Sequence, residues 1–314
     1  MRALVRFCII LLGWTIVVSA GALLAARQIG VTQITLVALV VGVQFAAIPT
    51  AAAALLFAAA RSRAGCAVAL VLTVVLAGIQ IPNFLADGPD ASGPEITVLS
   101  VNAAHGDADA QAIVDQVRSS GADILAVQEL TGEEEASLTA AGIDALLPHK
   151  FTAALPVADG TGLWSSTPLS GGTTLPDFGF VPVQATTVVD GVELTVVSFH
   201  SMAPATPRRT VQWAADLTRI RTVMETYKGT VVVAGDFNAT SDHRQFRQIA
   251  GDGFTDAADV AGAGLYRTFP ADRPLARLDH IVVSDTVDAS EVGPVPIPGS
   301  DHLAVTARLQ LPAG

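Results

Sequence analysis

Three long runs near the N-terminus contain no charged side chain, in contrast to the rest of the chain. Core helices of soluble proteins normally carry a polar stripe, which these runs lack. An α-helix of about 20 apolar residues crosses the roughly 30 Å hydrocarbon core of a bilayer, because each residue adds about 1.5 Å. Pro49 lies within the second run and is expected to kink or shorten it. The runs, residues 7–26, 28–60 and 64–86, predict three transmembrane helices near 4–26, 33–60 and 64–86.

The cationic residues that flank these runs predict their orientation, because Lys and Arg near membrane helices prefer the cytoplasmic side. Two precede the first run, one follows it, and two separate the second from the third: Arg2, Arg6, Arg27, Arg61 and Arg63. This asymmetry places the N-terminus inside and everything after residue 86 outside. Alternatively, the first run is a signal peptide cleaved at Val18-Ser19-Ala20, which also leaves the C-terminal part outside. Both interpretations predict a multi-pass cell-membrane protein with an extracytoplasmic domain.

Beyond the apolar runs, residues 87–94 are rich in Pro, Gly, Ser and Asp and predict a linker. Asp190-Gly191 further on favours a tight hairpin. Strands are predicted at 96–101, 124–128, 183–189, 194–199, 230–234, 278–283 and 303–309, and helices at 108–119 and 207–227. Because hairpins and helical crossovers alternate, residues 95–314 are predicted to form an α/β domain. Its expected architecture is a four-layered sandwich of two packed mixed β-sheets flanked by helices.

Composition narrows the environment and the partners of this domain. The two cysteines, Cys8 and Cys66, both fall in the membrane part, so neither indicates a disulfide framework or a zinc site. One of the 29 acidic and five of the 18 basic side chains precede residue 90, which leaves 28 acids against 13 bases. Nucleic-acid binders rely on Lys and Arg at phosphates, and no basic stripe is present here. Besides a substrate and the bilayer, no protein partner is evident.

Polar side chains stand where the predicted strands leave the core: Asn102, Glu129, His200, Asp236, Asn238, Asp301 and His302. A hard divalent cation prefers carboxylate oxygen, and Glu129 ends a buried strand where an unpaired charge would be costly. Glu129 is therefore a candidate metal ligand. Asp236 and Asn238 alternate on an extended segment and point to the same side. There the carboxylate would orient or deprotonate a water molecule while the amide donates to a phosphate oxygen.

Some of these residues also have a structural alternative. Glu129 would cap a helix that begins near Thr131, and Asn102 would form a turn. Asp236 and Asn238 would form an Asx turn before a helix, and His200 would be a structural histidine at a strand end.

In chain order, VLSVNAA, ADILAVQEL, VVSFH, VVVAGDFNAT, RLDHIVVS and GSDHLAVTARL resemble the successive motifs of the endonuclease/exonuclease/phosphatase superfamily, which includes DNase I-like nucleases. The resemblance covers nearly all of residues 95–310. It implies that Asn102 holds a metal-bound water or the substrate phosphate and that His200 contacts the scissile phosphate or the leaving group. It also implies that Asp279 orients His302, the second acid/base group, and that Asp301 faces the metal.

The resemblance implies hydrolysis of a phosphodiester or phosphomonoester by in-line attack of water, with Mg²⁺ (or Mn²⁺) bound through Glu129, Asp301 and Asn102. Three substrate classes stay open: nucleic acid, a phospholipid head group and a small phosphoester. The family's tyrosine or arginine that reaches the phosphate from the middle strand is absent, and the comparable stretch offers Trp164 and Ser165. A non-enzymatic alternative is a catalytically idle, membrane-tethered binding or sensor module.

Overall fold

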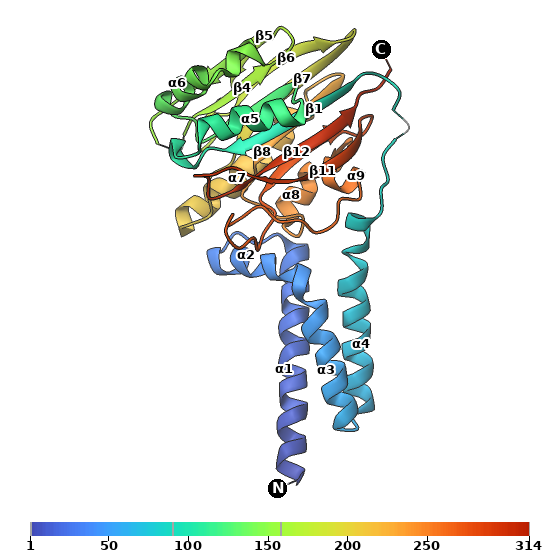
Figure 1. The fold of residues 1–314 in the computed structure, drawn as a ribbon. Coiled ribbons are helices and arrows are strands. Elements are labelled where there is room, and N and C mark those ends of the chain that lie inside the picture. Colours follow the sequence, from blue (N-terminus) through green and yellow to red (C-terminus); the bar gives the residue numbers. More distant parts are fainter. Residues whose placement is uncertain (1, 90, 158, 314) are drawn as a thin grey trace. The chain divides into compact units, whose positions relative to one another are not determined.

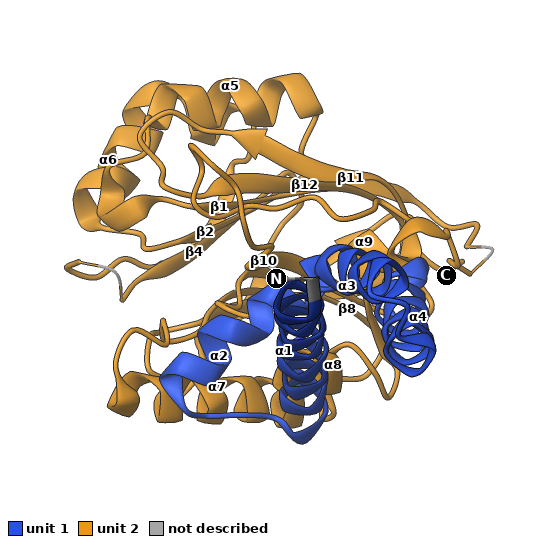
Figure 2. Ribbon diagram, turned by 90° about the horizontal axis from the view of Figure 1, so that it is seen from below, with its two compact units in different colours: residues 1–82, 242–244 blue, residues 83–241, 245–314 orange. Residues whose placement is uncertain are grey.

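The computed structural model describes residues 2–89, 91–157 and 159–313, so the predicted linker residue Asp90 lies outside the described residues. The chain divides into two compact units, which Figure 2 shows in different colours. Unit 1 consists of residues 1–82 and 242–244, and unit 2 consists of residues 83–241 and 245–314.

Unit 1 is helical, but it does not support the predicted count of three spans. Its helices are α1 (Arg2–Ile29), α2 (Ile34–Val40), η1 (Val41–Phe45), α3 (Ala47–Ala59) and α4 (Arg63–Gly78), followed by η2 (Ile81–Phe84). Of the described helices, α1 alone is long and apolar enough to cross a membrane by itself. The helices on either side of Ala46 are bent by 68°, so they form at most one broken span. With 16 residues, α4 is about 24 Å long, which is less than a typical hydrocarbon core.

The break in the second apolar run precedes Pro49 rather than following it. Pro49 occupies the third position of α3, within the first turn, where the missing backbone N–H is not needed for a helical hydrogen bond. Helices α1, α3 and α4 pack around Phe57, which is fully buried and meets the Trp14 ring edge-on at 5.3 Å. Gly13 and Gly65 lie so close to the Phe57 ring that a Cβ atom at either position would overlap it. Small residues therefore permit this close helix packing.

Unit 2 contains two six-stranded mixed β-sheets (Figure 1). The first has the order β11-β12-β1-β2-β4-β3 and the second has the order β5-β6-β7-β8-β10-β9. The strands of the first sheet are β1 (Glu95–Asn102), β2 (Ile124–Gln128), β3 (His149–Ala153), β4 (Thr161–Ser165), β11 (Asp288–Pro296) and β12 (Leu303–Gln310). Those of the second are β5 (Ser170–Thr174), β6 (Val183–Val189), β7 (Val192–His200), β8 (Thr230–Asp236), β9 (Phe254–Asp256) and β10 (Asp279–Ser284).

Helices cover the outer faces of both sheets (Figure 2). The first sheet is covered by α5 (Ala110–Ser120) and α6 (Gly132–Ala141), and the second by α7 (Pro207–Met224) and α8 (Arg244–Ile249). The remaining helical turns are η3 (Ala104–Gly106), η4 (Ile143–Ala145) and α9 (Ala257–Val260). The predicted four-layered α/β sandwich is thus the observed fold.

Strand alternation builds the two core layers on either side of the first sheet. Val98 and Ala126 point into the cluster between the two sheets, whereas their neighbours Leu99 and Leu125 point into the cluster beneath α5 and α6. This alternation follows from the two-residue period of a strand. All four side chains are fully buried, so β1 and β2 are central strands with little freedom to shift register.

The predicted hairpin is confirmed at Asp190-Gly191. The two residues have φ angles of 47° and 90° and connect β6 to β7, which pair in antiparallel register. Both positions therefore have the left-handed backbone that Asp and Gly tolerate in a two-residue hairpin turn.

Candidate active site

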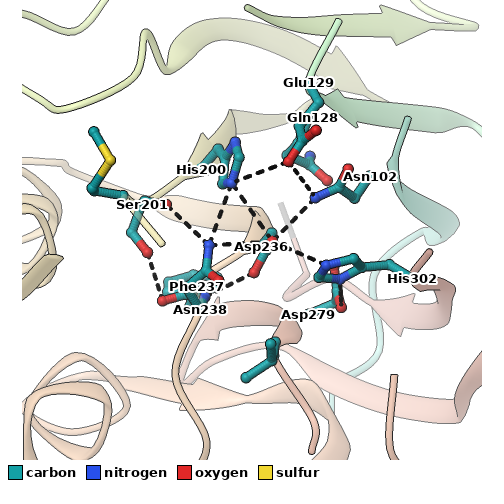
Figure 3. Close-up of polar contacts among 12 residues, drawn as sticks. Asn102, Gln128, Glu129, His200, Ser201, Asp236, Phe237, Asn238, Asp279 and His302 are labelled. Atoms are coloured by element: carbon teal, nitrogen blue, oxygen red, sulfur yellow. Dashed lines mark hydrogen bonds and ion pairs between the residues drawn. The ribbon is translucent and has the colours of Figure 1, made fainter. Parts of the chain in front are cut away.

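Strand pairing brings the polar strand ends of unit 2 to one place (Figure 3). His200 and Asp236 end the parallel strands β7 and β8 and are aligned in register. Asp279 begins β10, which runs antiparallel to β8, and it pairs with Asp236 from the other side. Asn102 ends β1 and pairs in parallel with Gln128, the residue before Glu129. The fold thus assembles most of the predicted site residues from the ends of five strands, β1, β2, β7, β8 and β10.

Asp236 lies at the centre of this group. Its Oδ2 atom accepts hydrogen bonds from the Asn102 amide at 3.1 Å and from the Asn238 amide at 3.3 Å. The same oxygen lies 3.6 Å from His200 Nε2 and 3.7 Å from His302 Nε2. One buried carboxylate oxygen therefore has two amides and two imidazoles around it.

The segment Asp236-Phe237-Asn238 is held by both backbone and aromatic packing. The Asn238 backbone N–H donates to Asp236 Oδ1 at 2.8 Å, and the Asn238 amide donates to the Ser201 carbonyl at 3.1 Å. Phe237 points the other way into the core, where its ring meets that of Phe199 at 4.9 Å. The predicted shared face of Asp236 and Asn238 is confirmed. The Asx-type turn is present as well, since the Asp236 side chain accepts from the N–H two residues on.

His302 is oriented by Asp279. Its Nδ1 atom lies 2.8 Å from Asp279 Oδ2, which directs Nε2 toward Asp236. Ser300 fixes the segment, because its hydroxyl donates to the Asn102 carbonyl at 2.7 Å and accepts from the His302 backbone N–H at 3.0 Å. The Phe269 ring lies 4.7 Å from the His302 ring.

The pKa values of Asp236 and His302 are both raised by their surroundings. Burial raises the pKa of Asp236 to about 8; His302 opposes this shift, and Asp279 and Glu129 add to it. For His302, burial disfavours the charge, but Asp279 and Asp236 outweigh burial and raise the pKa to about 10. Both shifts favour the protonated form, so the Asp236–His302 pair retains protons near neutral pH, which suits general acid–base chemistry.

Glu129 lies at the edge of the site and is anchored by neighbouring donors. The Asn102 amide donates to Oε1 at 3.3 Å, and the His105 backbone N–H donates to Oε2 at 2.8 Å. The His105 ring nitrogen Nδ1 lies 2.9 Å from the same Oε2. Glu129 does not cap the following helix: the N-cap of α6 is Thr131, whose hydroxyl accepts from the Glu134 N–H.

Two predicted features lie apart from this arrangement. Asp301 is exposed, and its carboxylate forms no hydrogen bond or ion pair with another described residue, so its place as a metal ligand stays a prediction. Trp164 and Ser165 are buried in β4 and do not reach the site as phosphate contacts. Trp164 belongs to the core beneath α5 and α6. The structure therefore shows no replacement from this strand for the missing phosphate-binding tyrosine or arginine.

The donor set fits a divalent cation. Three carboxylates, those of Glu129, Asp236 and Asp279, meet at the site, and none forms an ion pair with Lys or Arg among the described residues. Accumulated negative charge in a partly buried position calls for a compensating cation. One ligand atom each from Asp236, Asp279 and His302 also lies within 4.8 Å of the others. The close His302–Asp279 hydrogen bond already uses one nitrogen of this trio.

Sequence patterns missed two polar features near the site. His105 contacts Glu129, but it follows no predicted strand and so gave no signal. Behind the site, Asp256 lies 2.6 Å from His280 Nδ1 and 3.3 Å from Arg277 Nη2, and all three are buried. His280 Nε2 donates to the Ala239 carbonyl at 2.9 Å and so supports the segment that carries Asp236 and Asn238.

Comparison with known proteins agrees with this geometry. A model described as the "Endonuclease/Exonuclease/phosphatase family" matches residues 99–302, well over half of the chain. The chain belongs to this family. Members of the family are phosphoric ester hydrolases that generally depend on divalent metal ions, and the chain is therefore an enzyme of this class. No curated protein matches the sequence.

Solved structures share the fold of unit 2. An endonuclease/exonuclease/phosphatase from Beutenbergia cavernae is 19% identical over 69% of this chain and 72% of its own, with a TM-score of 0.57. Humanized D. rerio TDP2 is 15% identical over 68% of this chain and 98% of its own, with a TM-score of 0.58. D. rerio TDP2 complexed with single strand DNA product is 14% identical over 68% and 98%, with a TM-score of 0.56. At these identities the likeness establishes the fold alone.

Proposed function

We propose that the enzyme hydrolyses a phosphodiester or phosphomonoester bond by in-line attack of water, with Mg²⁺ or Mn²⁺ bound through Glu129, Asp301 and Asn102. The observation that carries this proposal is the buried Asp236 carboxylate, which has the Asn102 and Asn238 amides and the His200 and His302 imidazoles within 3.7 Å of one oxygen. The divalent ion would neutralise charge that develops on the phosphate.

Four side chains would carry out the other steps of the reaction: Asp236, Asn238, His200 and His302. Asp236 positions the attacking water and accepts its proton, because its carboxylate lies at the centre of the site between two amides and two imidazoles. Asn238 and His200 bind phosphate oxygens, since their side chains lie side by side at this face, with Nδ2 and Nε2 3.4 Å apart. His302, charged and held by Asp279, stabilises the negative charge of the transition state or moves a proton.

Two measurements on the full chain test the mechanism. EDTA should abolish phosphoester hydrolysis, and added Mg²⁺ or Mn²⁺ should restore it. Asp236→Ala should lower kcat by about 10²- to 10⁴-fold, the usual contribution of a general base. Asp252→Ala is the matched control, because Asp252 is an exposed carboxylate paired with Arg221 on the surface. Hydrolysis that survives both EDTA and Asp236→Ala would refute the proposed chemistry.

We infer the substrate class from the net charge of the domain and from its attachment to a membrane. The complex of D. rerio TDP2 with single strand DNA product supports a nucleic-acid substrate, and a nuclease acting on extracellular DNA is one candidate. Against it, the 28 acids and 13 bases from residue 90 onward disfavour binding to polyanions. An apolar helix that holds the enzyme at a bilayer would raise its effective concentration at lipid head groups. We therefore favour a phospholipid head-group phosphodiesterase.

Three substrates distinguish these classes under the same Mg²⁺ concentration: plasmid DNA, sphingomyelin in vesicles and a soluble inositol phosphate. The preferred class should show the highest kcat/KM, and we expect this to be sphingomyelin. Preference for plasmid DNA would assign a nuclease, and preference for the inositol phosphate would assign an enzyme for small phosphoesters. Metal binding without turnover of any of the three would favour the idle binding module.

We further propose that unit 2 lies on the outer side of a cell membrane, to which the apolar helix α1 attaches it. The arginines that flank the apolar runs support this orientation. A chain with Cys8 and Cys66 replaced by Ser, carrying Ser119→Cys on the exposed face of α5, provides the test. A membrane-impermeant maleimide should label it in intact cells, and the cysteine-free chain is the control. Labelling that requires lysis would place unit 2 inside.

A further inference from the structure

His105 contacts Glu129 through both its backbone and its ring. The His105 N–H donates to Glu129 Oε2 at 2.8 Å, and Nδ1 lies 2.9 Å from the same oxygen. Asn102 shapes this turn, because its side-chain oxygen accepts from the Ala104 N–H at 2.9 Å while its amide donates to Glu129 Oε1. The η3 turn and the residue that precedes it by two positions therefore contact both oxygens of the Glu129 carboxylate.

The backbone of this turn is unusual for the residues that occupy it. Ala104, His105 and Gly106 have φ angles of 47°, 60° and 86°, and Glu129 itself has a φ of 56°. Non-glycine residues pay roughly 1 kcal/mol or more in this left-handed region, and such conformations cluster at functional sites. Glycine would relieve the cost at position 105, but it would remove the imidazole from Glu129.

A surface hydrogen bond alone does not account for this strain. The His105 side chain is 58% exposed and that of Glu129 is 14% exposed, and pairs in such exposed positions contribute little to stability. The pair lies at the solvent-facing edge of the site, where an ion can enter and where the unpaired side of the imidazole stays accessible.

The spacing of the two side chains suits a shared ion. Two ligands at right angles around an octahedral ion, each roughly 2.1 Å from it, lie about 3 Å apart. Nδ1 of His105 and Oε2 of Glu129 are separated by 2.9 Å. Imidazole nitrogen suits Fe²⁺, Ni²⁺, Cu²⁺ and Zn²⁺, whereas Mg²⁺ prefers oxygen ligands. We propose that His105 is a metal ligand together with Glu129, and that this mixed nitrogen and oxygen site favours first-row transition metals over Mg²⁺, with Mn²⁺ as the spectroscopic probe.

The inference rests on the proposed metal site at Glu129, and Mn²⁺ binding to the full chain in detergent tests it without using activity. Electron spin echo spectroscopy of bound Mn²⁺ should show modulation from a directly coordinated ¹⁴N nucleus. His105→Ala should remove this modulation and weaken Mn²⁺ binding by about 10-fold or more in calorimetry. His105→Asp, which restores an oxygen ligand, should bind Mg²⁺ but give no nitrogen modulation.

His149→Ala is the matched control. His149 is a partly exposed histidine at the start of β3 and pairs with Ser165, which in turn pairs with Ile124 at the end of β2 away from Glu129. It should leave both the modulation and the affinity unchanged. Nitrogen modulation that persists in His105→Ala, or its absence in the unmodified chain with Mn²⁺ bound, would overturn the assignment of His105.

Two further variants show whether a negative result refutes only the role of His105 or also the proposed metal site at Glu129. Glu129→Gln should abolish Mn²⁺ binding if Glu129 holds the ion. If Mn²⁺ still binds to Glu129→Gln and the nitrogen modulation disappears instead in His302→Gln, the ion lies at the Asp236, Asp279 and His302 trio. That result would refute the Glu129 site and, with it, the role of His105. Loss of binding in Glu129→Gln with unchanged modulation in His105→Ala would refute His105 alone.

Discussion

Asp256 allows a quantitative test of the buried charge network behind the site. Its carboxylate is fully buried and lies 2.6 Å from His280 Nδ1 and 3.3 Å from Arg277 Nη2, and it also accepts from the Ala258 N–H at 3.0 Å. Asp256→Asn keeps the shape of the side chain but removes its charge. We expect the free energy of unfolding to fall, because a neutral amide cannot compensate two buried basic groups.

The magnitude follows from the same contacts. Breaking a buried ion pair by removing one partner costs about 3–5 kcal/mol. Asp259 keeps one contact to Arg277 at 3.4 Å, so the expected loss lies at the lower end, about 3 kcal/mol. Burial alone would raise the pKa of Asp256, but Arg277 and His280 outweigh burial and lower it from 3.8 to about 2. A difference of nearly two pKa units corresponds to about 2 kcal/mol, which agrees in size.

The pH dependence provides the sign of the effect. Because the pKa of Asp256 is lower in the folded state, the ionised carboxylate stabilises the fold above its unfolded pKa of 3.8, and this stabilisation disappears as the pH falls through about 2. The difference in unfolding free energy between the unmodified chain and Asp256→Asn should therefore be largest above about pH 5 and shrink toward pH 2.

Urea unfolding followed by tryptophan fluorescence measures this difference, since Trp164 and Trp213 are both fully buried in unit 2. The control is Asp252→Asn, which removes an exposed carboxylate, 76% accessible, from its ion pair with Arg221. That change should cost less than about 1 kcal/mol. If the two substitutions lower the unfolding free energy equally, or if the effect of Asp256→Asn is independent of pH, the account of this network is wrong.

Two further substitutions test local features of the site. Asp279→Asn removes the largest favourable contribution to the charge on His302, so the pKa of His302 should fall and the basic limb of the kcat/KM profile should move to lower pH; a limb that stays in place would contradict the assigned role of Asp279. Gly235→Ala should lower the unfolding free energy by about 3 kcal/mol, because its Cβ would overlap the Phe199 carbonyl oxygen in the β7–β8 pairing. Gly293→Ala in β11 meets open space and should be nearly neutral in the same urea titration.

The sequence predicted the central strands well because their patterns reflect burial on both faces. β1, β2, β8 and β10 consist largely of buried apolar residues, and each was predicted within two residues of its observed ends. Strands β3, β4, β5, β9 and β11 were not predicted, and two of them carry weak signals. β5, with the sequence SGGTT, is exposed throughout, and β11 is an edge strand that contains two prolines. Only pairing with β6 or β12 makes these segments strands, and pairing is a tertiary property.

In the apolar N-terminal part, the sequence predicted composition better than it predicted helix boundaries. Hydropathy registers apolar composition over a window, but it does not register where a helix breaks. The second run was predicted as one span at residues 33–60, whereas the chain bends at Ala46 between η1 and α3. Absence of charge therefore predicted which residues are apolar, but not how many straight helices they form.

Within the site, sequence order located the residues that end strands and missed those whose role depends on backbone conformation. Asp236 was recognisable because it follows an apolar strand, and Asp279 because its segment resembles a family motif; antiparallel pairing places the two side by side. His105 borders no strand, and only the left-handed turn at Ala104 and His105 directs its ring onto Glu129. A residue brought into a site by positive φ leaves no periodic trace in the sequence.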